Sequence, residues 1–509
     1  MSFDATIPYR LSPQASVREE PFGGLAYHAG NRRLVFLRAQ ELVEVVQGLE
    51  RYASAEAAVS ALSPGRRSSV LRSLAPLAAS GMIEPRSGLG SEVELGTGSV
   101  PPPPPAATGG AAPAFGSGGL ATTARGSSAQ PPTASRGLTN QLEQGLDAPV
   151  CITWELTYGC NLACIHCLSS SGRRDPAELS TAEAKAFLDE LAALSVFYVN
   201  VGGGEPTLRP DFDELVEHAV SRRVGIKFST NGTTMTEARA RRLASMDYVD
   251  VQVSIDGATA DTNDRVRGVG SYAAARTAME NLAAAGFAGF KISVVVTRHN
   301  VSELDGLAQM AGSYGAQLRL TRLRPSGRGA DTWDELHPTA VQQRELYRWL
   351  LDRPHVLTGD SFFHLSAFGA PLPGLNLCGA GRVVCLVDPV GDVYACPFVL
   401  HPEFKAGSVR SSRGFTGVWR SSELFAGLRE PETEGACSAC GSFDACHGGC
   451  MAAKFFTGLP LSGPDPECVF GWGESSRAGV AAGTTPSPGP GHSKPEAVAV
   501  ALLTRPRRR

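Results

Sequence analysis

The sequence lacks long hydrophobic runs, a secretory signal and a strong charge imbalance. No apolar run reaches the roughly 18 residues that indicate a transmembrane helix, and Met1–Arg10 shows no basic stretch followed by an apolar core. The formal net charge of the 509 residues is −3, so composition indicates no nucleic-acid partner. We therefore expect a cytoplasmic protein that binds neither a membrane nor nucleic acid.

Cysteine is absent before Cys151 and crowded after it. Of the 12 cysteines in the chain, three lie at 160–167 and eight lie between 378 and 468. A cytoplasmic protein keeps its thiols reduced, so grouped cysteines indicate metal ligands rather than a disulfide framework. Cys151 belongs to neither group, and we predict that it is a buried core thiol at the start of a strand.

Composition shifts divide the chain into segments. Residues 91–137 are rich in small residues and proline, including Pro101–Pro105, and cannot bury enough apolar surface to fold. The end of the chain is again rich in glycine, proline and serine. The predicted segments are a folded N-terminal module (1–90), a disordered linker (91–137), an α/β body (138–335), a cysteine-rich domain (336–474) and a disordered tail (475–509).

The N-terminal module has the pattern of a small α+β winged-helix-like domain. A turn at Gly30-Asn31 separates two apolar strands, which predicts a β-hairpin, and three helical patterns follow. A winged helix can bind DNA, but the only basic residues on the helices that could face DNA are Arg66, Arg67 and Arg72, which favours a peptide or protein ligand. The predicted elements are strands at 25–28 and 34–37 and helices at 40–49, 55–62 and 67–80.

The body alternates apolar strand patterns with helical patterns. This alternation is typical of βα repeats around a parallel sheet, whose strands are buried on both faces. About six βα units are too few for a complete eight-stranded barrel, so we predict an α/β fold with an open, partial (βα)6 barrel. The predicted strands are 152–156, 197–201, 225–229, 249–255, 291–297 and 318–323, and the predicted helices are 181–193, 210–221, 237–244, 272–285 and 301–314.

Three cysteines, Cys160, Cys164 and Cys167, follow the first of these strands with C-x3-C-x2-C spacing. A [4Fe–4S] cluster normally takes four thiolates, so three close cysteines leave one iron open to a substrate or cofactor, as in catalytic metal sites. A structural zinc site is the alternative. It would need a fourth ligand, and His166 lies between two of the cysteines in a poor position to provide it.

This spacing after a strand resembles the radical S-adenosylmethionine (SAM) superfamily. The resemblance implies that the three cysteines hold the cluster and that the open iron binds the amino and carboxylate groups of SAM. One electron would then cleave SAM to methionine and a 5′-deoxyadenosyl radical. The glycines before Glu205 match the superfamily's GGE motif, and Asp256 is either a further contact or a cap for the turn before its helix. The implied SAM contacts are Gly203, Gly204, Glu205, Ser229, Asn231, Ser254 and Arg267.

The cysteines between 378 and 468 resemble the SPASM extension of radical SAM enzymes. In that family the ligands of two auxiliary clusters interleave along the chain. The resemblance implies three [4Fe–4S] clusters in all, with the auxiliary pair carrying electrons or positioning the substrate, although spacing alone does not exclude zinc. The implied sets are Cys378, Cys385, Cys396 and Cys450 for the first auxiliary cluster, and Cys437, Cys440, Cys446 and Cys468 for the second.

Nearly all of 138–472 also resembles one subgroup, the mycofactocin radical SAM maturases. The stretches at 153–158, 167–174, 320–329 and 449–456 carry this likeness. Pro397 stands where sulfatase maturases have an acidic residue, which argues against formylglycine formation.

The N-terminal module, at Arg18–Tyr27, resembles the peptide chaperone of the mycofactocin pathway, which holds the leader of a ribosomally made precursor peptide. The chain therefore looks like a fusion of chaperone and maturase. A flexible linker would make the docking of the module intramolecular and let it reach the barrel mouth.

The resemblance implies a reaction in two steps. The C-terminal tyrosine of the precursor is decarboxylated oxidatively and is then joined to the neighbouring valine by a carbon–carbon bond, with electrons from a flavodoxin or ferredoxin. Arg322 is either a substrate contact or a solvated arginine. The segment Phe362–His364 is either a substrate contact or part of the core packing. The rival hypotheses are another SPASM peptide modifier, forming thioether or other carbon–carbon links, and a multi-zinc scaffold or regulator.

Overall fold

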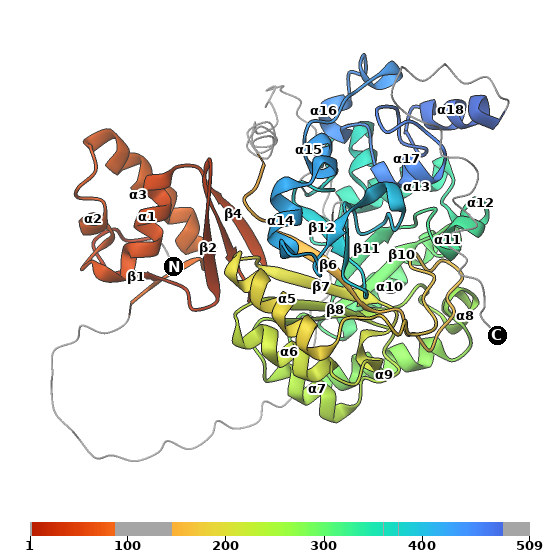
Figure 1. Cartoon of the computed structure of the whole chain (residues 1–509), viewed down its shortest axis with the longest axis horizontal. Coiled ribbons are helices and arrows are strands. Elements are labelled where there is room, and N and C mark those ends of the chain that lie inside the picture. The colour runs from red at the N-terminus through yellow and green to blue at the C-terminus, as the bar shows by residue number, and fades with distance from the viewer. Residues whose placement is uncertain (1–2, 87–144, 360, 375, 482–509) are drawn as a thin grey trace, which may run out of the picture.

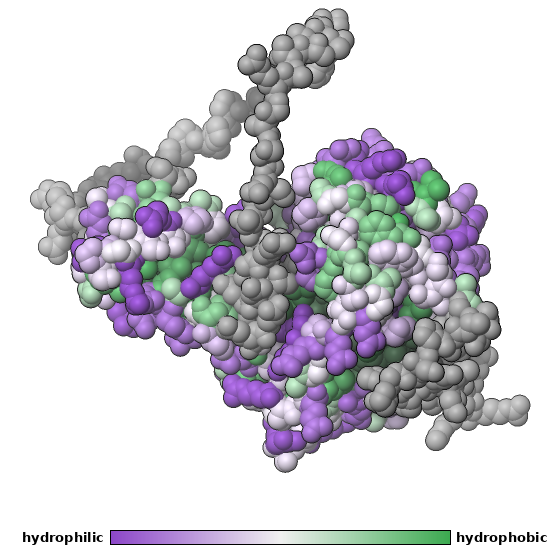
Figure 2. All heavy atoms as spheres, turned by 90° about the horizontal axis from the view of Figure 1, so that it is seen from above, coloured by the Kyte–Doolittle hydropathy of each residue, from purple (hydrophilic) through white to green (hydrophobic). Residues whose placement is uncertain are grey.

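The computed structural model describes residues 3–86, 145–359, 361–374 and 376–481. The predicted linker at 91–137 and most of the predicted tail lie outside these ranges. Figure 1 shows a small N-terminal module beside a larger α/β body. No helix of the described part is long and apolar enough to cross a bilayer. Figure 2 shows hydrophilic and hydrophobic residues intermixed on the visible face of both.

The N-terminal module contains a three-stranded antiparallel sheet in the order β2-β3-β4. The predicted hairpin is confirmed, with Ala26 of β3 opposite Val35 of β4. Ala26, Leu37 and Val43 belong to an apolar core that the module builds for itself. The three predicted helices are present, two of them shorter than predicted. The elements are β1 (Tyr9–Leu11), β2 (Ala15–Glu20), β3 (Gly23–His28), β4 (Arg33–Leu37), α1 (Gln40–Gly48), α2 (Ala55–Ala58), α3 (Pro64–Ala79) and β5 (Ile83–Pro85).

The body is built on a nine-stranded sheet in the order β11-β10-β9-β8-β7-β6-β12-β13-β14. Strands β6 to β11 are parallel and lie in chain order, which confirms the α/β class and the partial barrel. All the strands predicted for the body are found, within two residues at each end. They are β6 (Cys151–Thr157), β7 (Tyr198–Gly203), β8 (Gly225–Thr230), β9 (Val249–Ser254), β10 (Lys291–Val296) and β11 (Gln317–Arg322).

Helices cover one face of this sheet, so outward side chains are apolar. Trp154 packs edge-on against Phe187, with ring centroids 5.3 Å apart, and Phe228 packs against Phe212 at 5.0 Å. Side chains alternate along a strand, so Lys227, next to the outward-facing Phe228, faces the barrel interior. The barrel interior therefore carries charge, which the apolar strand pattern did not predict. The helices are α5 (Thr181–Ala193), α6 (Phe212–Ser221), α7 (Glu237–Ala244), α8 (Ala260–Arg267), α9 (Ser271–Ala284) and α10 (Leu304–Ser313).

The cysteine-rich part continues the same sheet. Strand β12 pairs in parallel with β6, and β13 and β14 follow antiparallel. The strands are β12 (Val384–Val387), β13 (Asp392–Tyr394) and β14 (Lys405–Ser408). The helices that follow β11, from the end of the body onward, are α11 (Arg328–Asp331), α12 (Trp333–Leu336), α13 (Ala340–Leu351), α14 (Gly414–Ser421), α15 (Glu423–Arg429), α16 (Phe443–Cys446), α17 (Met451–Phe456) and α18 (Trp472–Ala481). Short 3-10 turns lie at Leu49–Arg51, Pro206–Leu208, Val301–Glu303, Phe363–Phe368, Pro402–Phe404 and Gly435–Cys437.

Helix α18 corrects the predicted start of the tail, because it continues into 475–509 as far as Ala481. Ser475 N–H donates to Gly471 O over 3.1 Å. Arg477 pairs with Asp334 at 3.3 Å. The helix therefore extends past the start of the predicted tail, and Arg477 connects it to α12, a segment far away along the chain.

The module packs against the end of the barrel where the parallel strands begin. Tyr27 of β3 contacts the ring of Phe197 with centroids 5.5 Å apart. Arg32, in the β3–β4 turn, pairs with Asp250 at 2.9 Å. Leu25 and Tyr27 belong to the main core of the body. The module therefore lies at the end of the barrel opposite the cysteine loop, and not at the mouth that the tether was expected to let it reach.

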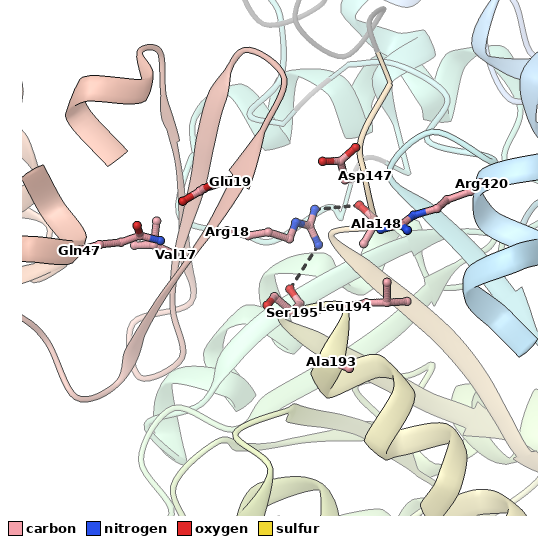
Figure 3. A pocket seen from close by; sticks show the side chains of 10 residues that line it. All are labelled: Val17, Arg18, Glu19, Gln47, Asp147, Ala148, Ala193, Leu194, Ser195 and Arg420. Atoms are coloured by element: carbon pink, nitrogen blue, oxygen red, sulfur yellow. Dashed lines mark hydrogen bonds between the residues drawn. The ribbon is translucent and has the colours of Figure 1, made fainter. Parts of the chain in front are cut away.

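A cleft of about 320 Å³ lies between edge strand β2 and the body. Figure 3 shows Arg18 extending across it, where the guanidinium donates to Ala148 O over 2.7 Å and to Ser195 O over 3.2 Å. The same side chain pairs with Glu20 of its own strand at 2.7 Å. One buried arginine thus links the module to backbone carbonyls of the body.

Candidate active site and cluster sites

The first three cysteines lie on the loop that follows β6, at the carboxyl edge of the parallel strands. Backbone hydrogen bonds close this loop: Cys160 N–H donates to Gly172 O, and Gly172 N–H donates to Tyr158 O, both over 2.9 Å. The three thiols are free and partly exposed. Burial raises the pKa of Cys160 and of Cys164. Three thiols without disulfide bonds at this edge suit a cluster with one open iron.

Glycines at the end of β7 allow a second loop to approach the cysteine loop. Gly203 has a φ of 101°, a conformation that favours glycine, and Gly204 N–H donates to Thr157 O over 2.7 Å. A Cβ on Gly204 would lie 2.0 Å from Gly159 O. Any side chain there would push the two loops apart.

Glu205, which the resemblance places near the amino group of SAM, is buried and bonded to protein groups. Its carboxylate accepts from the Thr230 hydroxyl over 2.9 Å and from Asn231 N–H over 2.6 Å, and also from Thr207. Burial raises the pKa of Glu205, and these hydrogen bonds oppose the rise. The Asn231 amide in turn donates to Asn161 in the cysteine loop over 2.9 Å. Glu205 and Asn231 therefore tie three loops together.

Asp256 connects the loop after β9 to the cysteine loop. Its Oδ2 lies 2.8 Å from His166 Nε2 and 2.7 Å from Arg267 Nε. Burial opposes ionisation, but Arg267 and His166 hold the pKa of Asp256 well below its usual value. The helix after it is capped by Thr259, so Asp256 does not serve as that cap. His166 faces Asp256, which argues against His166 as a zinc ligand.

The other predicted SAM contacts lie at the same edge of the sheet. Ser229 is near the end of β8, Ser254 ends β9, and both are partly exposed. Ligands of α/β sheets bind at this edge. The free thiols, close-packed glycine backbone and hydroxyls match the donors that a cluster and SAM require, so the residues fit both groups. Which atoms contact SAM stays a prediction.

The predicted second auxiliary set comes together in the structure. Cys437, Cys440, Cys446 and Cys468 line one cavity. Burial raises the pKa of Cys446 to about 11, with the other three thiols adding to the rise. Four thiols around one cavity are the number that an iron–sulfur cluster takes.

The first auxiliary set is brought together only in part. Burial raises the pKa of Cys396 well above its usual value, and the neighbouring thiols of Cys378 and Cys450 add to the rise. Burial likewise raises the pKa of Cys378, whose sulfur accepts a hydrogen bond from Met451 N–H. Cys385 does not join these three.

Cys385 lies within β12, directly opposite Ile152 of β6. Ile152 and Trp154 point to the same face of the sheet, which is the helix-covered face. Cys385 is fully buried there. Burial raises the pKa of this thiol well above its usual value, and the nearby Cys151 raises it further. Cys151 itself is buried at the start of β6, as predicted.

Arg322 is not solvated, because it forms a buried ion network with the loop before Cys468. Its guanidinium donates to Asp465 Oδ2 over 2.9 Å and pairs with Glu467. His364 approaches it at 3.5 Å and is buried together with Phe362 and Phe363. The alternative of core packing therefore describes that aromatic segment, and Arg322 connects the last barrel strand to the second auxiliary set.

A buried acidic pair beside the glycine loop was not predicted from the sequence. Glu155 of β6 has one carboxylate oxygen with no hydrogen-bond partner among the described groups. Burial raises its pKa to about 8, and Asp388 adds to the rise. Asp388 accepts a 3.1 Å hydrogen bond from the Tyr158 hydroxyl. A lone glutamate between Trp154 and Leu156 in a strand was the available signal, since glutamate is almost never fully buried unpaired.

Comparisons with known families agree with this architecture. Residues 154–311 match the radical SAM superfamily, residues 378–441 match an iron–sulfur cluster-binding domain (SPASM), and residues 8–84 match the peptide chaperone MftB family. The fold and the three matches define a radical SAM enzyme of the SPASM type with a peptide chaperone module in the same chain.

Relatives with high sequence identity show to which subgroup of radical SAM enzymes the chain belongs. The mycofactocin maturase MftC of Mycolicibacterium smegmatis is 64% identical over 379 residues, covering 72% of this chain and 95% of that protein. The protein of the same name from Mycobacterium tuberculosis H37Rv is 64% identical over 344 residues, covering 67% and 88%. The chain belongs to the mycofactocin maturase family of radical SAM peptide-modifying enzymes.

A solved structure shares the fold across most of the chain. Streptococcus suis SuiB, determined with bound S-adenosylmethionine, aligns with a TM-score of 0.61 over 90% of this chain and 99% of its own, at 16% identity. SuiB bound to its precursor peptide SuiA aligns equally well. The agreement concerns the fold alone.

Proposed function

We propose that this protein carries out both steps of peptide maturation in mycofactocin biosynthesis: oxidative decarboxylation of the C-terminal tyrosine of a ribosomal precursor, then Val–Tyr carbon–carbon cross-linking. The observation that carries the proposal is the 64% identity to a mycofactocin maturase over 95% of that relative. The cysteine and glycine loops, which meet at one edge of the barrel, support it.

Bound SAM and its cluster would supply a radical that removes a hydrogen atom from the substrate. The chain would hold both: Cys160, Cys164 and Cys167 the cluster, and the backbone at Gly203 and Gly204 the methionine part of SAM. Loss of a β-hydrogen atom, CO2 and one electron converts the terminal tyrosine carboxylate to an unsaturated tyramide. The site therefore also needs an electron acceptor.

The auxiliary cysteine sets would provide this acceptor, giving three clusters in all. We assign Cys378, Cys396 and Cys450 to the first auxiliary cluster. Cys437, Cys440, Cys446 and Cys468 would hold the second. Backbone N–H groups that donate to ligand sulfurs, as Met451 does to Cys378, tune the potential of such clusters. A flavodoxin or ferredoxin would reduce the SAM cluster.

The N-terminal module would hold the leader of the precursor. Its match to the peptide chaperone family supports this role, as does the fold shared with SuiB, which has been solved with its precursor peptide. Strand β4 is an edge of the module's sheet, where an extended peptide can add as a further strand. Residues 1–90, 138–335 and 336–474 would form three domains, the last two of which share one sheet.

The test uses the full chain, reconstituted under anaerobic conditions with iron and sulfide. It is incubated with SAM, a reductant and a precursor ending in Val-Tyr. Mass spectrometry should show loss of CO2 and two hydrogens, with 5′-deoxyadenosine formed alongside. Replacing Cys160, Cys164 and Cys167 with alanine should abolish both products. A peptide that loses two hydrogens but keeps its carboxylate would instead indicate another SPASM cross-linking activity.

A further inference from the structure

The segment after β11 lies between the cysteine loop and the first auxiliary set. Arg328 N–H donates to Cys167 O over 2.9 Å, and Arg328 Nε donates to Cys164 O over 2.8 Å. A Cβ on Gly329 would lie 2.9 Å from Arg324 O and 3.2 Å from His166 O. Gly329 therefore packs between the backbone of Arg324 and the loop that carries the first three cysteines.

The side chain of Arg324 extends toward the auxiliary cysteines. Its guanidinium carbon lies 3.5 Å from the centroid of the Phe398 ring. Phe398 follows Cys396 by two residues, and its N–H donates to the Cys396 sulfur. Arg324 thus belongs to the segment that follows the cysteine loop in space, and its side chain contacts a residue bonded to a ligand of the proposed first auxiliary site.

The charge of Arg324 is only partly compensated by the protein: it opposes the burial-driven rise in the pKa of Glu467, but the two side chains form no ion pair. The residue is 6% exposed. Nη1 donates to Arg322 O over 3.1 Å, whereas Nε has no hydrogen-bond partner among the described groups. No carboxylate of the described residues forms an ion pair with it, in contrast to Arg322, two positions earlier, which pairs with Asp465 and Glu467. A buried, unpaired cation is costly, so this position favours an anionic ligand.

We propose that Arg324 binds the C-terminal carboxylate of the precursor peptide and thereby places its terminal tyrosine between the SAM site and the first auxiliary site. The ring of Phe398 fixes the plane of the guanidinium. The edge containing Nε is free to donate to a carboxylate, the planar pairing for which arginine is suited. This inference rests on the proposed decarboxylation, because that reaction requires a free terminal carboxylate.

The test compares two precursor peptides, one ending in tyrosine carboxylate and one in tyrosine amide. For each peptide, the rate of 5′-deoxyadenosine formation gives the specificity constant kcat/KM for wild-type enzyme, Arg324→Gln and Arg324→Lys. Wild type should prefer the acid by about tenfold to a hundredfold, the value of a charge-assisted hydrogen bond. Arg324→Gln should lose this preference, and Arg324→Lys should keep part of it because the charge remains. Arg241→Gln, an exposed arginine on α7, is the matched control and should preserve the full preference.

Two results would overturn the inference. One is a wild-type enzyme that treats acid and amide peptides alike, which needs no variant and is therefore independent of folding. The other is an Arg324→Gln enzyme that keeps the acid preference while the reduction potential of an auxiliary cluster shifts, since Arg324 would then be a counter-charge for the cluster. In both cases, wild-type decarboxylation of the acid peptide would leave the proposed function intact. Absence of decarboxylation by wild type would count against the proposed function itself.

Discussion

Arg322 and Arg324 are two residues apart, yet only Arg322 forms ion pairs with buried carboxylates. Arg322 is enclosed by Asp465 and Glu467, which flank the loop leading to Cys468. Arg324 has an aromatic ring and a backbone carbonyl as neighbours. Sequence alone cannot separate the two, because the side chains that surround them come from segments far away along the chain.

Removal of Arg322 should destabilise the protein strongly. Arg322→Leu leaves Asp465 and Glu467 buried without their counter-charge, which typically costs about 3–5 kcal/mol. Denaturant unfolding of anaerobic protein should show this loss, and iron bound by the second auxiliary set should fall.

The matched control is Arg241→Leu. Arg241 forms an exposed ion pair with Glu237 on the same helix, and such pairs contribute about 0–1 kcal/mol. An equal loss of stability in both variants would contradict the role assigned to the Arg322 network.

Glu155 should make stability depend on pH. Burial, with help from Asp388, raises its folded-state pKa from 4.5 to about 8. Between these values the folded protein binds more protons than the unfolded chain, so stability falls as pH rises and the loss is complete above the folded pKa. In thermal unfolding at pH 6, 7, 8 and 9, the midpoint temperature should fall as pH rises. In Glu155→Gln this dependence on pH should be weaker. The same slope in both proteins would exclude Glu155 as its source.

At the scale of elements, the close approach of two loops depends on the absence of side chains. Gly204→Ala would set a Cβ 2.0 Å from Gly159 O and force the glycine loop away from the cysteine loop. Formation of 5′-deoxyadenosine should fall at least tenfold, with iron in the auxiliary sites retained. Gly312→Ala on α10 is the matched control, because its Cβ would meet no atom within 4 Å. Retained activity in Gly204→Ala would show that the two loops need not touch.

The register of β12 against β6 predicts different consequences for two cysteines. Cys396→Ala should remove iron from the first auxiliary site, because this thiol lies beside Cys378 and Cys450. Cys385→Ala should leave the iron of the first auxiliary site in place, because Cys385 is opposite Ile152 in the sheet. Iron analysis and electron paramagnetic resonance of the two variants would decide. Iron loss in Cys385→Ala would restore the four-cysteine set that the SPASM resemblance implies.

At the scale of the whole molecule, the module is docked through its own sheet rather than merely tethered. Arg32→Ala removes the contact with Asp250, and Tyr27→Ala removes an aromatic contact with Phe197. The double variant should show faster hydrogen exchange in β3 and β4 and weaker peptide modification, because the leader would no longer be held in one place. Arg10→Ala, which breaks an exposed pair with Glu84 inside the module, should leave both properties unchanged. Unchanged exchange in the double variant would mean that docking does not depend on these residues.

Local pattern was sufficient to predict the elements of the body. Alternating strands and helices predicted the partial barrel, and the three close cysteines predicted a cluster site, because the residues concerned are near one another in the chain. The position of Gly203 and Gly204 at the end of a strand was likewise predicted from residues close together in the chain. The tail was misjudged because its order comes from contacts such as Arg477 with Asp334, which composition does not encode.

The sequence by itself determined where the cysteines gather and where the strands run, since spacing and periodicity are local properties. Only the tertiary structure decided that Cys385 stands apart, that Arg324 is a buried cation without an ion-pair partner among the described residues, and that the module sits at the far end of the barrel. The reason is physical: strand register, burial and charge pairing depend on segments that meet only after folding.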